Sequence, residues 1–180
     1  MTRRLAPFID EEVAIVGIEP SAILTFRDEY QRLLPNHPLV QKLKNQTFLI
    51  EEFLAKEFEN QSLDHSIFHK ESAEVKVHVH CHQKALSNTK VTFDVLNQIP
   101  NYKVSIINSG CCGMAGSFGY EAEHYKVSMK MGGLRLFKSI QKSDYRTIIV
   151  ANGTSCRHQI KDGASRDAIH PIQVIEHALI

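Results

Sequence analysis

The sequence predicts an α/β fold, a parallel sheet of βα repeats flanked by helices. Short segments rich in Val and Ile recur in the second half of the chain, at residues 75–80, 103–108 and 146–151. They alternate with longer amphipathic segments, and strands that alternate with helices in this way form parallel sheets. In such sheets the functional crevice lies beyond the carboxyl ends of the strands.

The first 70 residues predict one strand and two helices. Residues 11–17 are an apolar strand candidate, and Ser21 is a suitable cap for a helix that Pro35 ends. Residues 45–58 predict a second helix, because Phe and Leu recur at helical spacing. Residues 61–72 are polar and predict a loop, which makes them the expected boundary between two domains.

The remaining predicted helices separate or follow the three later strands. They cover residues 84–98, residues 121–139 and the segment from Pro171 to the C-terminus. Pro171 suits the first turn of a helix, where its missing N–H costs nothing. A glycine pair at 132–133 weakens the centre of the second of these helices.

Composition excludes several classes of protein. Apolar residues make up 43% of the 180 residues, which is enough for a sizeable core. The formal net charge of +1, without a basic stripe, argues against nucleic-acid binding. No apolar run is long enough to span a bilayer, and no apolar stretch follows the N-terminal arginines as in a secretory signal. We therefore expect a cytoplasmic protein, with peripheral attachment to the inner membrane through partners left open.

The four cysteines each follow the end of a predicted strand. They are Cys81, Cys111, Cys112 and Cys156. If the sheet is parallel, the three loops that carry them open at the same edge, so we expect one shared site. In a reducing compartment, clustered cysteines are metal ligands or redox groups rather than disulfides.

The spacing favours an iron–sulfur cluster over zinc. Four thiolates suit either centre, but structural zinc sites usually contain closely spaced C-x2-4-C pairs, and this chain has no CxxC. Adjacent Cys111 and Cys112 reach two irons of a cluster more easily than two corners of one tetrahedron. A structural zinc site, a redox-active Cys111–Cys112 dithiol, and buried cysteines without any ligand remain the alternatives.

Residues around the cysteines are weaker candidates. His80, His82 and His158 are expected to hydrogen-bond sulfur, to replace a thiolate or to bind a substrate carboxylate, and ordinary loop histidines explain them equally well. Gly113 belongs to a glycine-rich segment that lets backbone N–H groups point at an anionic centre. We expect the vicinal pair near the start of the 121–139 helix, where the helix dipole would lower thiol pKa values.

Three segments together resemble the cysteine-rich CCG domain family: residues 78–82, residues 110–116 and residues 154–157. That family includes heterodisulfide reductase subunits, iron–sulfur subunits of glycolate, glycerol-3-phosphate and lactate oxidation systems, and C-terminal regions of FAD-linked oxidases of D-2-hydroxy acids such as D-2-hydroxyglutarate. The resemblance implies that Cys81, Cys111, Cys112 and Cys156 hold a 4Fe-4S cluster that transfers electrons.

The resemblance also implies missing parts. It divides the chain into residues 1–70, the end of a degenerate first repeat, and residues 71–180, a second repeat with the cysteine site. Ala22 stands where the first repeat would carry a cysteine, and Gln159 stands where some relatives carry a second cysteine in the last motif. FAD and ferredoxin-like domains are expected on other parts of the same enzyme. We expect this piece to contain no catalytic residue and not to oxidise a substrate alone.

Overall fold

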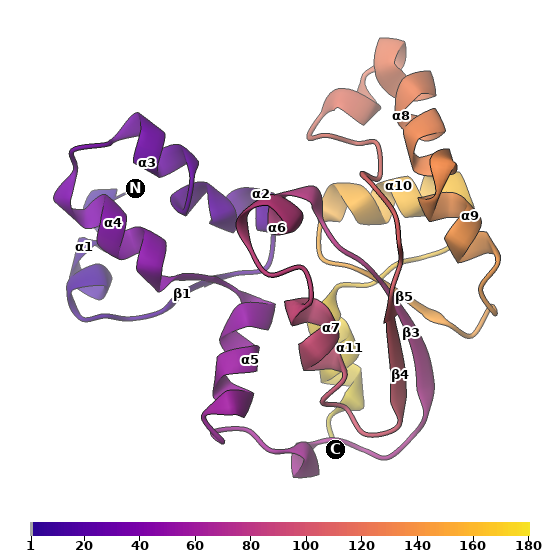
Figure 1. The fold of residues 1–180 in the computed structure, drawn as a ribbon, viewed down its shortest axis with the longest axis horizontal. Coiled ribbons are helices and arrows are strands. Elements are labelled where there is room, and N and C mark those ends of the chain that lie inside the picture. Colours follow the sequence, from indigo (N-terminus) through magenta and orange to yellow (C-terminus); the bar gives the residue numbers. More distant parts are fainter. Residues whose placement is uncertain (1) are drawn as a thin grey trace.

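The computed structural model describes residues 2–180 and contains two parallel sheets with helices around them (Figure 1). The smaller sheet pairs β1 (Ile15–Gly17) with β2 (Thr47–Leu49). The larger sheet has the order β4-β3-β5, with β3 (Ala73–His78) between β4 (Tyr102–Ile106) and β5 (Ile148–Ala151). The prediction of an α/β fold with parallel strands is confirmed.

The helices of the first half are short and surround the smaller sheet. They are α1 (Thr2–Asp10), α2 (Pro20–Ile23), α3 (Glu29–Leu33), α4 (Pro38–Gln46) and α5 (Ile50–Glu59). The helices that follow the larger sheet's strands are α6 (Cys81–Leu86), α7 (Val91–Leu96), α8 (Ala122–Leu134), α9 (Leu136–Gln141), α10 (Thr154–Ala164) and α11 (Pro171–Ala178). No helix within residues 2–180 has the length and apolar character needed to cross a membrane.

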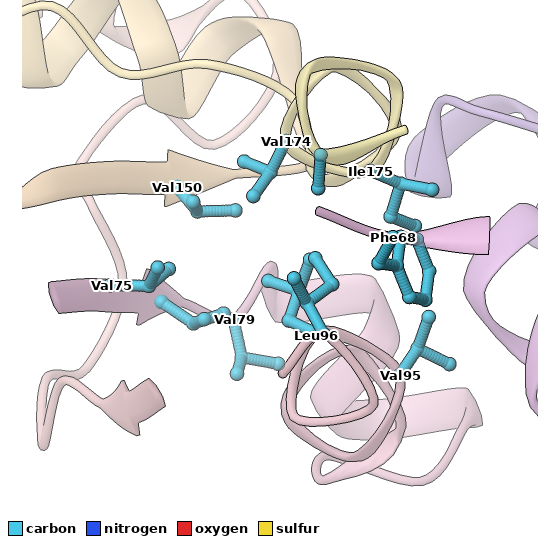
Figure 2. Close-up of a cluster of buried hydrophobic side chains, with 11 residues drawn as sticks. Phe68, Val75, Val79, Val95, Leu96, Val150, Val174 and Ile175 are labelled. Atoms are coloured by element: carbon cyan, nitrogen blue, oxygen red, sulfur yellow. The ribbon is translucent and has the colours of Figure 1, made fainter. Parts of the chain in front are cut away.

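The larger sheet has an apolar core on each face. On one face, Val75 and Val150 pack with Leu96 of α7 and Val174 of α11 (Figure 2). On the other face, β5 packs against the cluster that contains Cys112 and Cys156 and the apolar side chains of α9 and α10. Burial of β5 and of the second half of β3 on both faces is consistent with their Val- and Ile-rich composition, whereas β4 is more exposed.

Replacing Leu96 with alanine should lower the free energy of unfolding by about 2–5 kcal/mol, because the side chain is 0% exposed and leaves a cavity. Leu134→Ala is the matched control. Its side chain is 68% exposed, so a loss of less than about 0.5 kcal/mol is expected. Urea unfolding of both variants measures the difference, and equal losses would contradict this description of the core.

Three predicted helices are interrupted in the structure. The 84–98 prediction is wrong at residues 87–90, where the Asn88 side chain accepts a hydrogen bond from the Lys90 N–H (2.9 Å) and holds a turn. The 121–139 helix breaks at Arg135 (φ −138°). The 45–58 helix starts later, because residues 47–49 form β2 instead.

Two further differences concern the first half and the last loop. The helix predicted to follow Ser21 is divided into α2, a 3-10 turn and α3, and Ser21 lies inside α2 rather than at its cap. The Ser21 hydroxyl instead donates to Glu19 (2.8 Å). The sequence pattern does not predict α10, although its first turn carries Cys156. This segment has few apolar residues, so no helical apolar spacing marks it.

Candidate metal centre

The four cysteines lie at the carboxyl edge of the larger sheet. Cys81 begins α6 after β3, Cys111 and Cys112 lie in the loop after β4, and Cys156 lies in the first turn of α10 after β5. All four line one cavity of about 420 Å³. The parallel order of the strands brings these loops together, because their carboxyl ends share one edge.

The thiols form a continuous series of contacts. Cys112 and Cys156 are buried, and their Sγ atoms are 3.3 Å apart. Cys81 and Cys111, both half-buried, interact with each other, and Cys111 also interacts with Cys112. The order of contact is therefore Cys81, Cys111, Cys112, Cys156.

Contacts between the thiols shift their pKa values in opposite directions. Contact with Cys112 lowers the pKa of Cys156 to about 5, and contacts with Cys112 and Cys81 lower the pKa of Cys111. Contact with Cys111 raises the pKa values of Cys81 and Cys112 above the ordinary thiol range. The arrangement therefore favours the thiolate form at Cys111 and Cys156, and thiolate is the form that binds metals.

The loop after Cys112 turns its backbone toward sulfur. The Gly113 N–H donates to Cys111 Sγ (3.3 Å), and the Ala115 N–H also stabilises this thiolate. Gly113 and Gly116 have positive φ values of 104° and 71°, which glycine adopts without strain. Such N–H groups favour an anionic centre at this point.

The predicted position of the vicinal pair at a helix start is wrong. α8 begins at Ala122, well after Cys112. It is Cys156 that lies in the first turn of a long helix, where the helix dipole favours its thiolate.

His78 lies in the 78–82 motif segment, but the sequence analysis assigns it no role at the site. Its side chain is 1% exposed and its Nδ1 lies 2.9 Å from Ser109 Oγ, while Nε2 has no hydrogen-bond partner among the described residues. One ligand atom each from His78, Cys112 and Cys156 lie within 4.8 Å of one another. This buried cluster could hold a metal ion. A histidine at the end of a strand buried on both faces is the signal in the sequence that points to it.

The other candidate histidines differ in position. His80 and His82 line the cavity and their rings are stacked 5.6 Å apart. His80 also caps α6, and burial lowers its pKa. His158 is not among the cavity-lining residues and instead bonds the Tyr120 hydroxyl (2.6 Å).

Residues 19–21 of the first half reach this edge as well. The Glu19 carboxylate accepts the Thr154 N–H (2.8 Å) at the start of α10, and Ser21 lines the cysteine cavity. Although burial raises the pKa of Glu19, hydrogen bonds from Thr154 and Ser21 bring it below its usual value. The segment that precedes Ala22 therefore helps to enclose the site of the second half.

Two residues that follow Cys156 in α10 have local structural contacts. The Arg157 guanidinium donates to the carbonyl oxygens of Ala151 and Asn152 (both 2.9 Å), so it stabilises the turn before α10. Gln159 is buried and donates to Ser128 Oγ (2.8 Å), which ties α10 to α8.

A buried carboxyl group lies beside the same turn. Glu51 of α5 is 1% exposed and accepts a hydrogen bond from the Asn152 side chain (3.0 Å). Burial raises the pKa of Glu51 to about 7, only partly offset by hydrogen bonds that include those from Asn152 and Thr92. Glu51 is therefore mostly uncharged below neutral pH.

The ionisation of Glu51 should make the free energy of unfolding depend on pH. Between about pH 4.5 and pH 7 the unfolded chain ionises Glu51 while the folded chain keeps its proton, so stability falls as pH rises through this window. Glutamine does not ionise, so Glu51→Gln should not show this fall. Between pH 4.5 and pH 8 its free energy of unfolding should rise, relative to that of the unmodified protein, by on the order of 3 kcal/mol. Urea unfolding of metal-free protein across this range measures it, and parallel pH profiles for the two proteins would rule it out.

Comparison with known proteins agrees with the sequence motifs. The chain is 32% identical to a subunit of the anaerobic glycerol-3-phosphate dehydrogenase of Escherichia coli K12 over 105 residues, which are 58% of this chain and 26% of that protein. It is 30% identical to D-2-hydroxyglutarate dehydrogenase of Pantoea ananatis over 163 residues, 89% of this chain and 15% of the relative. The chain is a distant homologue of both proteins. D-2-hydroxyglutarate dehydrogenase of Pseudomonas putida is 26% identical over 96% of this chain.

These matches concern only part of each relative. The chain spans about a quarter of the glycerol-3-phosphate dehydrogenase subunit and about a sixth of the D-2-hydroxyglutarate dehydrogenases. No protein-family model and no solved structure matches it.

Proposed function

We propose that this chain is an electron-transfer module that holds a 4Fe-4S cluster on Cys81, Cys111, Cys112 and Cys156. The observation that carries the proposal is the meeting of four thiols at one cavity, in a continuous series of contacts. Contacts among the thiols favour the thiolate form at Cys111 and Cys156, and thiolate is the form that a cluster binds.

The surroundings fit an iron–sulfur centre. Cys112, Cys156 and Met114 are buried in an apolar cluster, which limits the access of water to their sulfur atoms. The Gly113 and Ala115 N–H groups near Cys111 would offset the negative charge of thiolates and sulfides. When bound, a cluster of this kind supplies one-electron transfer. The protein would bind the cluster, limit the access of water to it and set its reduction potential.

The similarity to two dehydrogenases supports a role in an oxidoreductase. We propose that the partners are FAD-binding and ferredoxin-like domains or subunits of a flavin-dependent 2-hydroxy-acid dehydrogenase in the cytoplasm. The module would pass electrons between such partners without touching substrate. None of its residues is proposed as catalytic.

Iron and sulfide analysis tests this proposal. Protein purified without oxygen, or reconstituted with iron and sulfide, should be brown and contain about four iron and four sulfide per chain. After one-electron reduction with dithionite it should give a cluster signal by electron paramagnetic resonance. Reconstituted protein that is folded but binds neither iron nor sulfide would contradict it.

A zinc site is the second candidate, and the His78–Cys112–Cys156 cluster favours it. Neutral imidazole and thiolates are common zinc ligands. A single substitution separates the two candidates: Cys81→Ser should remove a four-thiolate cluster but leave zinc on His78, Cys112 and Cys156. The measurement is metal content by elemental analysis.

A thiol redox element is the third candidate. The cysteines form no disulfide, and the Cys112 and Cys156 Sγ atoms are 3.3 Å apart. Cys111 contacts Cys112 as well, so an oxidised pair could be either one. Peptide mapping after mild oxidation would identify a reversible disulfide if this candidate is correct.

A further inference from the structure

A buried polar network connects the first half of the chain to two of the cysteine-bearing segments. Its members are Glu51, Gln83, Thr92 and Asn152, and each is 2% exposed or less. They come from α5, α6, α7 and the turn before α10. Hydrogen bonds join these residues across as many as 101 positions of the sequence.

The hydrogen bonds of the network pass through Asn152. Its side-chain NH₂ donates one hydrogen bond to Glu51 Oε1 (3.0 Å) and another to Gln83 Oε1 (2.8 Å). The Gln83 NH₂ donates to Thr92 Oγ1 (3.1 Å) and to the Asn88 carbonyl oxygen (3.3 Å). Both donors of each amide are thereby used.

The network touches the site through the chain itself. Gln83 lies two residues after Cys81 in α6, and Asn152 directly precedes Gly153, the cap of α10. Gly153 packs so closely on the His80 ring that a Cβ atom would lie 2.3 Å from His80 Cδ2. A shift of Asn152 would therefore move both the start of α10, with Cys156, and the residue before Cys81.

The Glu51 carboxyl group uses only one of its two oxygens in the network's hydrogen bonds among the described residues. Two buried oxygens, Glu51 Oε2 and Asn152 Oδ1, accept no hydrogen bond from the described residues. A proton on Oε2 converts one of these acceptors into a donor. The neighbouring carboxylate, Glu52, bonds Arg27 and Ser87, and the ion pairs of the described residues do not include Glu51.

We infer that Glu51 is a positioning residue for the cysteine site: its carboxyl group holds Asn152 and, through it, Gln83, and so fixes the segments that carry Cys156 and Cys81. This inference rests on the proposed metal site for its function, but the network can be tested separately. It makes the first half of the chain a required part of the site in the second half.

The test compares four variants with the unmodified protein. Glu51→Ala removes the network contact, and Glu51→Gln keeps a neutral group with a donor and an acceptor. Glu59→Gln, an exposed change on the same helix, is the control for altered charge. Leu43→Ala, a buried position of α4, is the control for lost stability without a change in the network.

The first readout is alkylation of Cys156 by iodoacetamide in metal-free protein, followed by mass spectrometry. Glu51→Ala should raise the rate by about tenfold, equivalent to about 1.4 kcal/mol of easier local opening, and more than Leu43→Ala does. Glu51→Gln and Glu59→Gln should stay close to the unmodified protein. Equal rates in Glu51→Ala and Leu43→Ala would overturn the inference.

The second readout is the visible spectrum and affinity of Co²⁺ bound to thiolates. Glu51→Ala should change the ligand-field bands and weaken Co²⁺ binding by about tenfold or more, as loss of supporting contacts does in metal sites. Glu51→Gln should restore both. An unchanged spectrum and affinity in Glu51→Ala would overturn the inference. If unmodified protein bound no Co²⁺ while the alkylation pattern held, the proposed metal site would fail and the network would stand.

Discussion

Replacing Cys112 with serine should abolish cluster assembly. Cys112 is the central thiol of the site, since it contacts both Cys111 and Cys156, and it is only 2% exposed. A serine hydroxyl is a poor ligand for iron, and water cannot easily replace a sulfur atom at a buried position. Iron, sulfide and visible absorption of reconstituted protein should all fall to background.

Two other variants make this result specific. Ser155→Ala changes a cavity-lining residue without removing a sulfur and should keep full iron content. His78→Gln should also keep iron if the four thiolates are the ligands, whereas a His78–Cys112–Cys156 metal site would lose its metal. Normal iron and sulfide in Cys112→Ser would refute the proposed ligand set.

Gly113→Ala should be among the most destabilising single changes in the chain. The residue has φ 104°, and a Cβ atom would lie 2.2 Å from the backbone oxygen of Ser128 in α8. Backbone cannot move aside as a flexible side chain can. The strain and the clash together should cost about 3 kcal/mol or more in the free energy of unfolding.

Neighbouring glycines separate the two causes. Gly110→Ala meets no atom within 4 Å and should be nearly neutral, while Gly116→Ala has only the positive φ (71°) and should cost about 1 kcal/mol. Urea unfolding of the three metal-free variants measures this order. If Gly113→Ala lost no more free energy of unfolding than Gly116→Ala, the clash with the Ser128 backbone oxygen would not contribute to the destabilisation.

The sequence is sufficient for the type of fold and for the edge at which the cysteines lie. Val- and Ile-rich segments alternate with helices, and that local pattern determines a parallel sheet. Each cysteine follows a strand, so the edge of the sheet at which they lie can be predicted without knowing how the elements pack. The helix breaks are harder to predict, since Asn88 and Arg135 interrupt segments whose apolar spacing continues across them.

The tertiary structure alone decides which groups face one another at that edge. Local periodicity does not specify that Cys112 contacts Cys156, that a ring nitrogen of His78 lies close to both, or that Glu51 bonds Asn152, 101 residues away. Such contacts depend on how whole elements pack, and the burial that shifts the pKa of Glu51 exists only after they have packed. The cysteines and their place along the chain are therefore determined by the sequence, while their neighbours and charge states are determined by the folded arrangement.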